Sequence, residues 1–225
     1  MSDNYWDKLM DSDEGAASYM ETYGEGPGSE TRNIIASFIN EKESVLDVGC
    51  GPGWNFDHFR EYGPRIGIYK GTDYSERFVR IANERFKQKF SPGFRENSWH
   101  KAPFEVGDVR HFKEPDNSWD VVILQDVLEH TNGYERPLRE AMRVAKKRII
   151  VTFWRGQMMD DFHDDGIDRV RDDGDDGHCG EYSRIAFEKF LDSLDVHWLE
   201  TQTPEGANRW HIFYVIDKEE PHGKQ

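Results

Sequence analysis

Three glycines stand at alternate positions, Gly49, Gly51 and Gly53, directly after a short run of mostly apolar residues, 44–48. Glycine carries no side chain, so a ligand can lie directly against its backbone N–H groups. The apolar run is typical of a buried strand, and a helical pattern begins close behind the glycines. In an open parallel sheet, ligands bind at the carboxyl end of such a strand. We therefore predict that the glycine turn, residues 49–53, is a ligand cradle.

The spacing of the glycines argues against two common phosphate-binding turns. A dinucleotide fingerprint would have its third glycine where this chain has Trp54, and no Gly-Lys-Ser/Thr ending indicates a P-loop. Aspartates, in contrast, recur where the predicted strands end, at Asp47, Asp73, Asp108 and Asp126. A single aspartate there often only caps a helix or turn. Four at successive strand ends favour a ligand that lacks phosphate and carries a positive charge.

Short apolar runs alternate with longer amphipathic segments, which predicts an α/β fold. Seven strands are expected, at residues 44–48, 66–72, 103–106, 120–125, 148–153, 197–203 and 211–216. Helices are expected at residues 56–62, 76–90, 134–145 and 183–194, with Ser75 and Ser183 as N-caps. No helix separates the last two strands, so they should be antiparallel. The predicted fold is a Rossmann-like, seven-stranded, mostly parallel sheet with helices on both faces and a C-terminal antiparallel strand pair.

Residues 41–225 are expected to form this domain, after an N-terminal helical extension or lid, residues 1–40, which contains a helix over residues 30–39. An Asp-rich insertion spans residues 155–180. Its acids and histidines are of the metal-binding type. It lacks, however, the regular oxygen spacing of a calcium loop and the second thiol of a zinc site. We expect a flexible, solvated acidic loop and no bound metal.

Four segments carry a resemblance to a known family. V-L-D-V-G-C-G-P-G, residues 45–53, resembles the first motif of the class I S-adenosylmethionine-dependent methyltransferases. G-T-D-Y-S, residues 71–75, and F-E-V-G-D-V, residues 104–109, are similar to the ends of the family's second and third strands. W-D-V-V-I-L-Q-D-V-L-E-H, residues 119–130, resembles its fourth strand and exit loop. The resemblance covers residues 44–153 and implies S-adenosyl-L-methionine as cofactor and S-adenosyl-L-homocysteine as product.

The resemblance also implies roles for single residues. Asp73 would accept hydrogen bonds from both ribose hydroxyls, which a carboxylate can do. Asp108 would accept from the adenine amino group, and the backbone N–H of Val109 would donate to the ring. Gly49 and Gly51 would let the homocysteine portion lie against the backbone. The predicted cofactor-binding residues are Tyr23, Arg32, Asp47, Gly49, Cys50, Gly51, Gly53, Asp73, Tyr74, Asp108, Val109 and Gln125.

Several residues have alternative roles. Asp47 could hold the N–H groups of the turn, or the cofactor ammonium through water, or be purely structural. Gln125 could offer its backbone carbonyl to the ammonium and its side-chain amide to the transfer site. His130 is a candidate general base because its unperturbed pKa is near neutral, although it could only brace its loop. Gln125 and His130 are the predicted catalytic residues. Trp54 and Phe56 could line the ligand site or belong to the core.

Methyl transfer depends mainly on positioning the nucleophile and excluding water, because the sulfonium is already a good leaving group. A base is needed only for some acceptors. The methyl acceptor is therefore expected to bind between the N-terminal extension and the insertion. The candidate residues there are Tyr5, Trp6, Tyr19, Tyr23, Arg32, Trp154, Arg155, His163, His178, Glu181 and Tyr182.

The net charge of −15, from 44 acidic and 29 basic residues, disfavours nucleic acid as a partner. The Asn/Asp-Pro-Pro-aromatic turn of DNA amino-methyltransferases is absent, and neither Cys50 nor Cys179 has the Pro-Cys context of a cytosine C5 enzyme. No apolar run approaches the ~20 residues of a membrane span. Two cysteines and an N-terminus without a signal-peptide pattern fit the cytoplasm. The oligomeric state stays open.

The sequence thus predicts an enzyme that transfers a methyl group from S-adenosyl-L-methionine to an O or N atom of a small-molecule acceptor. Two alternatives keep the cofactor: a catalytically silent partner subunit that binds it without turnover, and a methyltransferase that acts on a peptide or RNA. An NAD-dependent oxidoreductase is less compatible with the sequence, because Trp54 replaces the third glycine of the dinucleotide fingerprint.

Overall fold

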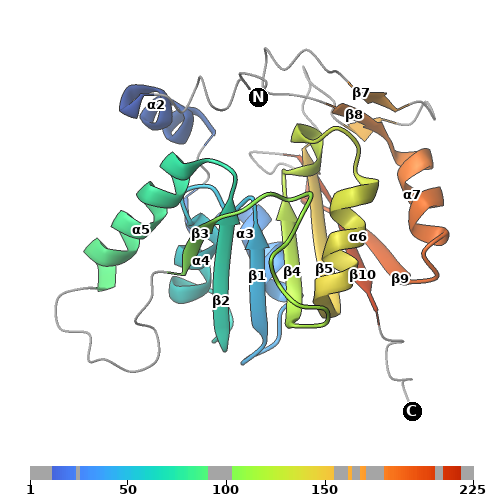
Figure 1. The fold of residues 1–225 in the computed structure, drawn as a ribbon, viewed down its shortest axis with the longest axis horizontal. Coiled ribbons are helices and arrows are strands. Elements are labelled where there is room, and N and C mark those ends of the chain that lie inside the picture. The colour runs from blue at the N-terminus through green and yellow to red at the C-terminus, as the bar shows by residue number, and fades with distance from the viewer. Residues whose placement is uncertain are drawn as a thin grey trace.

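The computed structural model describes residues 12–23, 26–90, 103–154, 162–163, 168–170, 180–205 and 210–218. Its main sheet has seven strands in the order β3-β2-β1-β4-β5-β10-β9 (Figure 1). β10 is antiparallel to both of its neighbours, and the other neighbouring strands are parallel. This topology confirms the predicted fold class. The strands are β1 (Ser44–Val48), β2 (Ile68–Asp73), β3 (Phe104–Val106), β4 (Trp119–Gln125), β5 (Ala145–Trp154), β9 (His197–Gln202) and β10 (His211–Asp217).

The predicted helices are all present, with small differences at their ends. Ser183 caps its helix as expected, because its hydroxyl accepts from the N–H of Ala186, and the Ser75 hydroxyl accepts from Phe78. The extension contains two helices where the sequence predicts one. The helices are α2 (Asp13–Tyr23), α3 (Glu30–Ser37), α4 (Trp54–Glu61), α5 (Glu76–Phe90), α6 (Glu135–Val144) and α7 (Arg184–Asp192), with a 3₁₀ turn, η1 (Leu128–His130).

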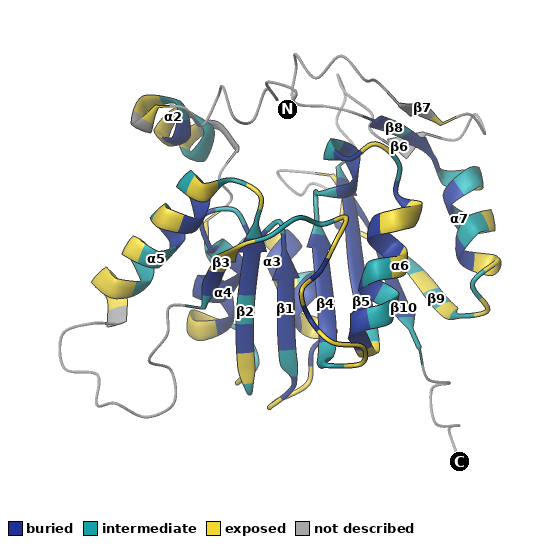
Figure 2. Ribbon diagram, viewed as in Figure 1, coloured by how far each residue is buried: buried dark blue, intermediate teal, exposed yellow. Residues whose placement is uncertain are grey.

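Side chains along each strand alternate between the two faces of the sheet, and both faces are covered by helices. In β4, Val122 and Leu124 belong to the hydrophobic core on one face, called the first core, whereas Val121 and Ile123 belong to the second core, on the other face. Helices α6 and α7 close the first core, and α3, α4 and α5 close the second (Figure 1). The central strands are therefore buried along most of their length (Figure 2). No helix among the described residues has the length and apolar character needed to cross a membrane.

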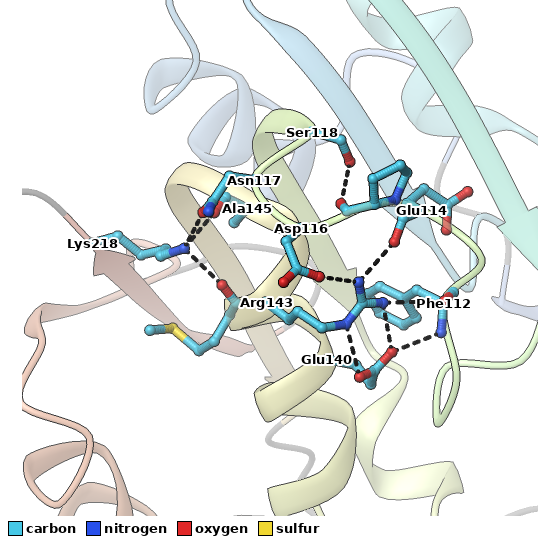
Figure 3. Close-up of polar contacts among 11 residues, drawn as sticks. Phe112, Glu114, Asp116, Asn117, Ser118, Glu140, Arg143, Ala145 and Lys218 are labelled. Carbon is cyan, nitrogen blue, oxygen red and sulfur yellow. Dashed lines mark hydrogen bonds and ion pairs between the residues drawn. The ribbon is translucent and has the colours of Figure 1, made fainter.

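A polar cluster fastens the segment that enters β4, at the amino edge of the sheet (Figure 3). Arg143 of α6 donates to the carbonyl oxygens of Phe112 and Glu114, at 3.1 and 2.8 Å. It also pairs with the carboxylates of Asp116, at 2.7 Å, and Glu140, at 2.9 Å. One guanidinium group thus satisfies several acceptors of an irregular segment, because its donors form a rigid fork.

Lys218, just after β10, closes the same edge from the other side (Figure 3). Its ammonium donates to the side-chain oxygen of Asn117 at 2.8 Å and to the carbonyl oxygens of Met142, at 2.8 Å, and Ala145, at 2.6 Å. Burial lowers the pKa of this lysine. The amino edge of the sheet is therefore held by polar contacts within the chain.

The opposite, carboxyl edge of the parallel strands faces α2 and a small second sheet (Figure 1). This sheet has the strand order β6-β8-β7 and consists of β6 (Phe162–His163), β7 (Arg169–Val170) and β8 (Gly180–Ser183). The prediction of a solvated loop throughout the insertion is wrong for β6 and β7, because both pair with β8. Strand β8 is largely buried, and such pairing satisfies backbone groups that would otherwise need water.

Candidate functional site

The glycine turn follows β1 and contains three glycines with left-handed backbone, at φ values of +73°, +52° and +84°. A Cβ on Gly49 would lie 2.3 Å from a methyl group of Val127, and one on Gly53 would lie 2.7 Å from the ring of Phe104. These two positions exclude a side chain because the protein itself fills the space. A Cβ on Gly51 would meet nothing within 4 Å. Gly51 is therefore the glycine whose α-carbon faces open space.

The N–H groups of the turn are held mainly by the end of β2. The N–H groups of Gly49 and Cys50 donate to the carbonyl oxygen of Thr72, at 2.7 and 3.0 Å. The N–H of Gly51 donates to one carboxylate oxygen of Asp73 at 2.9 Å, and the N–H of Ser75 donates to the other at 2.8 Å. Burial raises the pKa of Asp73 to about 6. Asp73 thus joins the glycine turn to β2, beside the open position at Gly51.

Asp47 does not hold the N–H groups of the turn, contrary to one of its predicted roles. Its carboxylate accepts from the Tyr69 hydroxyl at 2.5 Å and from the Asn55 side chain at 3.4 Å. It is 1% exposed, and burial raises its pKa to about 6. The side chain of Asp47 points to the face covered by α4, away from the turn's N–H groups, because alternate residues of a strand face opposite sides. Its observed contacts connect β1 with β2 and α4.

Cys50 lies inside the turn and is buried. A Cβ on Gly71 would lie 2.9 Å from its sulfur, so the thiol packs tightly against β2. Burial raises the pKa of the thiol, which keeps it neutral and unreactive. Tyr74, which follows β2, has a side chain that is 55% exposed. Of these two predicted cofactor-binding residues, Cys50 offers packing, and Tyr74 offers an accessible ring at the carboxyl edge.

Asp108 lies after β3, as the sequence predicts, but its carboxylate is already engaged. Both of its oxygens accept hydrogen bonds from Arg110, the shortest at 2.7 Å, and the N–H of Arg110 donates to one of them at 2.8 Å. These bonds lower the pKa of Asp108. An adenine amino group would have to share this carboxylate with the guanidinium. Val109, the next residue, is half-buried against the first core.

Gln125 ends β4, beside the glycine turn, because β4 pairs with β1 and Val127 packs against Gly49. Its side-chain oxygen is buried and has no hydrogen-bond partner among the residues that the structure describes. Its side-chain nitrogen lies 3.5 Å from a carboxylate oxygen of Asp126. A buried acceptor without a partner is costly, and such atoms usually mark a place where water or a ligand binds.

A polar pair, the partly exposed Asp126 and the buried His211, lies next to Gln125, and sequence reasoning missed it. The Nε2 atom of His211 is 3.1 Å from one carboxylate oxygen of Asp126, and the Thr152 hydroxyl donates to the other at 2.6 Å. The Nδ1 atom of His211 is 3.2 Å from the hydroxyl of Thr31 in α3. A signal for the pair was present: an antiparallel strand begins at the carboxyl edge of its parallel neighbours, and His211 is the first residue of β10.

His130 ends η1, and its side chain is half-buried. The loop that follows η1 is braced by Tyr182 of β8. The Tyr182 hydroxyl donates to the carbonyl oxygen of Thr131 at 2.7 Å and accepts from the N–H of Gly133 at 3.1 Å. Tyr182 was expected to contact the acceptor, but it is fully buried and holds this loop.

The extension contributes Arg32, which is 5% exposed, to this region of the fold. Its guanidinium lies 5.6 Å from the centre of the Trp54 ring and donates to the Ser29 hydroxyl at 3.0 Å. Trp54 is half-buried at the start of α4, whereas Phe56 belongs to the second core. Of the two aromatic residues, only Trp54 keeps part of its ring accessible.

The remaining predicted acceptor-site residues are described only in part. Tyr19 packs against Phe78 of α5, with ring centres 5.4 Å apart, and Trp154 and Glu181 are half-buried. No cluster of metal-ligating side chains occurs among the residues that the structure describes. The side chains of six candidates lie outside the described residues, namely Tyr5, Trp6, Tyr23, Arg155, His163 and His178.

The comparison with protein families agrees with this geometry. Residues 46–152, from β1 to β5, match the family model described as "Methyltransferase domain". Over this segment the chain is similar to a methyltransferase domain. The cofactor of the family is S-adenosyl-L-methionine, and the matched segment contains the glycine turn, Asp73, Asp108 and the exit of β4.

Known proteins resemble the methyltransferase domain over different lengths. A sterol 24-C-methyltransferase of Aspergillus fumigatus is 31% identical over 135 residues, which are 59% of this chain and 33% of that protein. The first curated relatives are each covered over 33% to 47% of their own length.

Two solved structures share the fold over most of the chain. One is magnesium protoporphyrin IX methyltransferase from Synechocystis with bound S-adenosylmethionine, with a TM-score of 0.63, 16% identity and 91% of both chains covered. The other is a chain of the complex between the Haloferax volcanii Trm112 methyltransferase activator and the putative methyltransferase. It has a TM-score of 0.66 at 14% identity and covers 95% of this chain and 97% of that one. At these identities the likeness shows the fold alone.

Proposed function

We propose that this protein is an enzyme that transfers a methyl group from S-adenosyl-L-methionine to an oxygen or nitrogen atom of a small molecule. The observation that carries the proposal is the open position at Gly51. Its neighbours Gly49 and Gly53 are closed by Val127 and Phe104, so the turn leaves room for a ligand at one of its three glycines. This opening lies beside Asp73, at the edge where α/β sheets bind ligands.

The residues around this opening fit the cofactor. Gly51 would let the amino-acid portion lie against the backbone, and Asp73 keeps acceptor capacity for the ribose diol, because each of its oxygens receives one hydrogen bond from the chain. Gln125 offers an unpaired buried acceptor to an ammonium group or to the methyl acceptor. When bound, the cofactor supplies an electrophilic methyl group on a sulfonium sulfur. Asp108 fits less directly, because Arg110 occupies both of its oxygens.

The protein's own contribution to such a reaction would be positioning and the exclusion of water. The elements available for this at the carboxyl edge are α2 and the small sheet β6-β8-β7 (Figure 1). Their placement supports the proposal that the extension and the insertion bind the methyl acceptor. His130, half-buried in η1, stays a candidate base for acceptors that must lose a proton.

Two observations support a small-molecule acceptor. Two of the similar proteins are a sterol methyltransferase and a magnesium protoporphyrin IX methyltransferase, and sterols and porphyrins are both small molecules. The net charge of −15 disfavours a long polyanion. A peptide or an RNA end is the alternative acceptor. We further propose a reducing cytoplasmic location, because burial of Cys50 inside the turn leaves no room for a disulfide there.

Calorimetric titration tests the cofactor assignment directly. The purified protein is titrated with S-adenosylmethionine, S-adenosylhomocysteine and NAD, and the titrations are repeated with Asp73→Ala. The matched control is Asp116→Ala, which removes an exposed carboxylate at the opposite edge of the sheet. We expect micromolar binding of the first two ligands to the wild type and to the control, and at least tenfold weaker binding to Asp73→Ala, because hydrogen bonds to a charged group are strong.

Binding of NAD alone, or of none of the three ligands, would refute the proposal. If the cofactor binds, an acceptor screen that follows the formation of S-adenosylhomocysteine separates an enzyme from a silent partner subunit. A silent subunit would bind both adenosyl compounds and form no product with any acceptor, whether small molecule, peptide or RNA.

A further inference from the structure

Asp126 is held in place by three elements that are far apart in the sequence. Its own N–H donates to the Thr152 hydroxyl of β5 at 3.0 Å, and that hydroxyl donates to the Asp126 carboxylate at 2.6 Å. His211 of β10 contacts the other carboxylate oxygen at 3.1 Å. Thr31 of α3 then contacts the second ring nitrogen of His211 at 3.2 Å. With the side-chain nitrogen of Gln125, which lies 3.5 Å from the same carboxylate, the chain thus builds a polar network around Asp126.

The backbone of Asp126 is also unusual, because its φ is +52°, in the left-handed region. Aspartate tolerates this region better than most residues, yet it still costs free energy that the surrounding contacts must offset. The network does not bury the carboxylate completely. The side chain of Asp126 is 30% exposed, whereas that of His211 is 2% exposed. The histidine is therefore on the inside, and the carboxylate is on the accessible side.

The polar atoms at this end of β4 are predominantly hydrogen-bond acceptors. Burial alone would raise the pKa of Asp126, but the contacts with His211 and Thr152 outweigh it and lower the pKa, so the carboxylate is ionised at neutral pH. The neighbouring Gln125 oxygen is a second acceptor, and no described residue donates a hydrogen bond to it. Gln125 is the last residue of β4, the strand that lies beside the glycine turn, and Asp126 follows it. A group that binds to these two acceptors must bring N–H or O–H donors.

We propose that Asp126, positioned by His211 and Thr152, orients the methyl acceptor by accepting a hydrogen bond from its hydroxyl or amino group. This inference rests on the proposed function and specifies its substrate class: neutral or cationic alcohols and amines. Anionic acceptors are disfavoured, because the fixed carboxylate would repel them. Asp126 contacts the acceptor, whereas His211 is a positioning residue that acts through it.

The N-terminal extension also supports the polar network around Asp126, through the hydrogen bond between Thr31 and His211. Helix α3 carries Thr31, which is 1% exposed, and fixes the ring of His211 from the side opposite to Asp126. A histidine that is bonded through both nitrogens cannot rotate freely, so the carboxylate that it contacts keeps one orientation. This orientation would decide which substrate hydrogen points away from the transferred methyl group.

The test uses four probes and the protein saturated with S-adenosylhomocysteine, which cannot react. Phenol and aniline each carry a donor hydrogen, and anisole and N,N-dimethylaniline are their matched counterparts without one. Ligand-observed NMR at millimolar concentration measures binding to the wild type, Asp126→Asn, His211→Phe and His211→Gln. The control is His197→Gln, because His197 is exposed and lies at the other end of the β9-β10 hairpin. S-adenosylhomocysteine titration checks that each variant is folded.

We expect the wild type and the control to bind phenol and aniline at least tenfold more tightly than their methylated counterparts, as expected for a hydrogen bond to a charged acceptor. This preference should be lost in Asp126→Asn and His211→Phe and partly restored in His211→Gln. Equal binding within each pair, no binding of phenol and aniline to the wild type, or an unchanged preference in Asp126→Asn would overturn the inference.

If Asp126→Asn fails to bind S-adenosylhomocysteine, the comparison of His211→Phe with His211→Gln carries the test. Those two variants then decide it alone: a preference that His211→Phe retains overturns the inference. Failure of the wild type to bind S-adenosylhomocysteine would instead count against the proposed function, so the two failures are distinguishable.

Discussion

At the scale of single residues, Gly49 and Gly51 share a left-handed backbone but differ in their surroundings. A side chain on Gly49 would collide with Val127, whereas one on Gly51 would project into open space. The first glycine is required by packing within the protein. The second is free of that constraint, which is what a ligand contact requires.

This difference makes a matched pair of variants informative. Gly51→Ala should lower the free energy of unfolding by only about 1–2 kcal/mol, the cost of the left-handed backbone. It should also weaken S-adenosylhomocysteine binding at least tenfold. Gly49→Ala adds a steric conflict that costs about 1–3 kcal/mol more. Urea denaturation and calorimetry measure both effects. Unchanged affinity in a folded Gly51→Ala protein would contradict the assignment of this glycine.

A second residue-scale prediction concerns pH. Burial raises the pKa of Asp73 to about 6, so the carboxylate is protonated below that value and loses acceptor capacity. Cofactor affinity should be constant above pH 6 and fall by up to tenfold per unit below it. The folded pKa lies above the ordinary value of 3.8, so protonation of Asp73 stabilises the fold as the pH falls. Loss of binding near pH 5 would therefore not reflect unfolding caused by this group.

Titrations between pH 5 and 8 test this prediction with two variants. Asp73→Asn should bind the cofactor weakly and without this pH dependence. Asp47→Asn is the control, because Asp47 also has a pKa of about 6, but its carboxylate accepts hydrogen bonds from Tyr69 and Asn55 and not from the glycine turn. If the dependence disappears in Asp47→Asn and persists in Asp73→Asn, the roles of the two residues are reversed.

At the scale of elements, the two edges of the sheet have different polar chemistry. At the amino edge, the donors of Arg143 and Lys218 are matched with acceptors of the chain (Figure 3). At the carboxyl edge, Gln125 has a buried acceptor to which no residue in the described part of the chain donates, and Asp126 keeps an accessible carboxylate. Satisfied polar groups stabilise a fold, whereas unsatisfied ones are retained where a ligand completes them.

Arg143→Ala tests this division between the edges. The change leaves carbonyl oxygens of the segment that enters β4 without their donor, so the free energy of unfolding should fall by about 1–3 kcal/mol. Affinity for S-adenosylhomocysteine should stay within threefold of the wild type, because the cluster lies at the opposite edge from the glycine turn. Denaturant titration and calorimetry on the same preparation measure the two quantities. A large loss of affinity without a loss of stability would show that the edges are coupled.

At the scale of the whole molecule, the extension divides into two unequal parts. Helix α2 packs on α5 through Ala16 and Tyr19, in a small separate cluster. Helix α3 belongs to the second core, where Ile35 is fully buried, and it also supplies Thr31 to the polar network. The predicted division of the chain at residue 40 would therefore cut through packed structure.

Two truncations test this organisation. Removal of residues 1–23 should leave a cooperatively folded protein, because the described residues among them pack in the small cluster on α5 and not in either main core. Removal of residues 1–40 should abolish cooperative unfolding or cost more than about 4 kcal/mol, since several buried side chains of α3 are lost together. Circular dichroism during thermal unfolding measures both. A stable protein that lacks residues 1–40 would restore the predicted domain boundary.

The sequence predicts the main sheet well, because its signals are local. Each buried strand is a short apolar run, and the glycines, Ser75 and Ser183 mark turns and caps within a few residues. Strands β6 and β7 were missed, because two-residue strands form only where a partner lies beside them. Helix α2 was missed for a related reason: its apolar contacts with α5 come from packing and leave little pattern in a short polar segment.

The sequence by itself determined the α/β class, the position of the glycine turn and the acids that follow the strands, because these depend on residue type and spacing along the chain. Only the tertiary structure decided what each acid contacts. Asp47 accepts a hydrogen bond from Tyr69, and Asp108 accepts hydrogen bonds from Arg110. Asp126 contacts His211, which lies 85 residues further along the chain. Such pairings depend on which elements become neighbours when the sheet closes, and no local pattern encodes that choice.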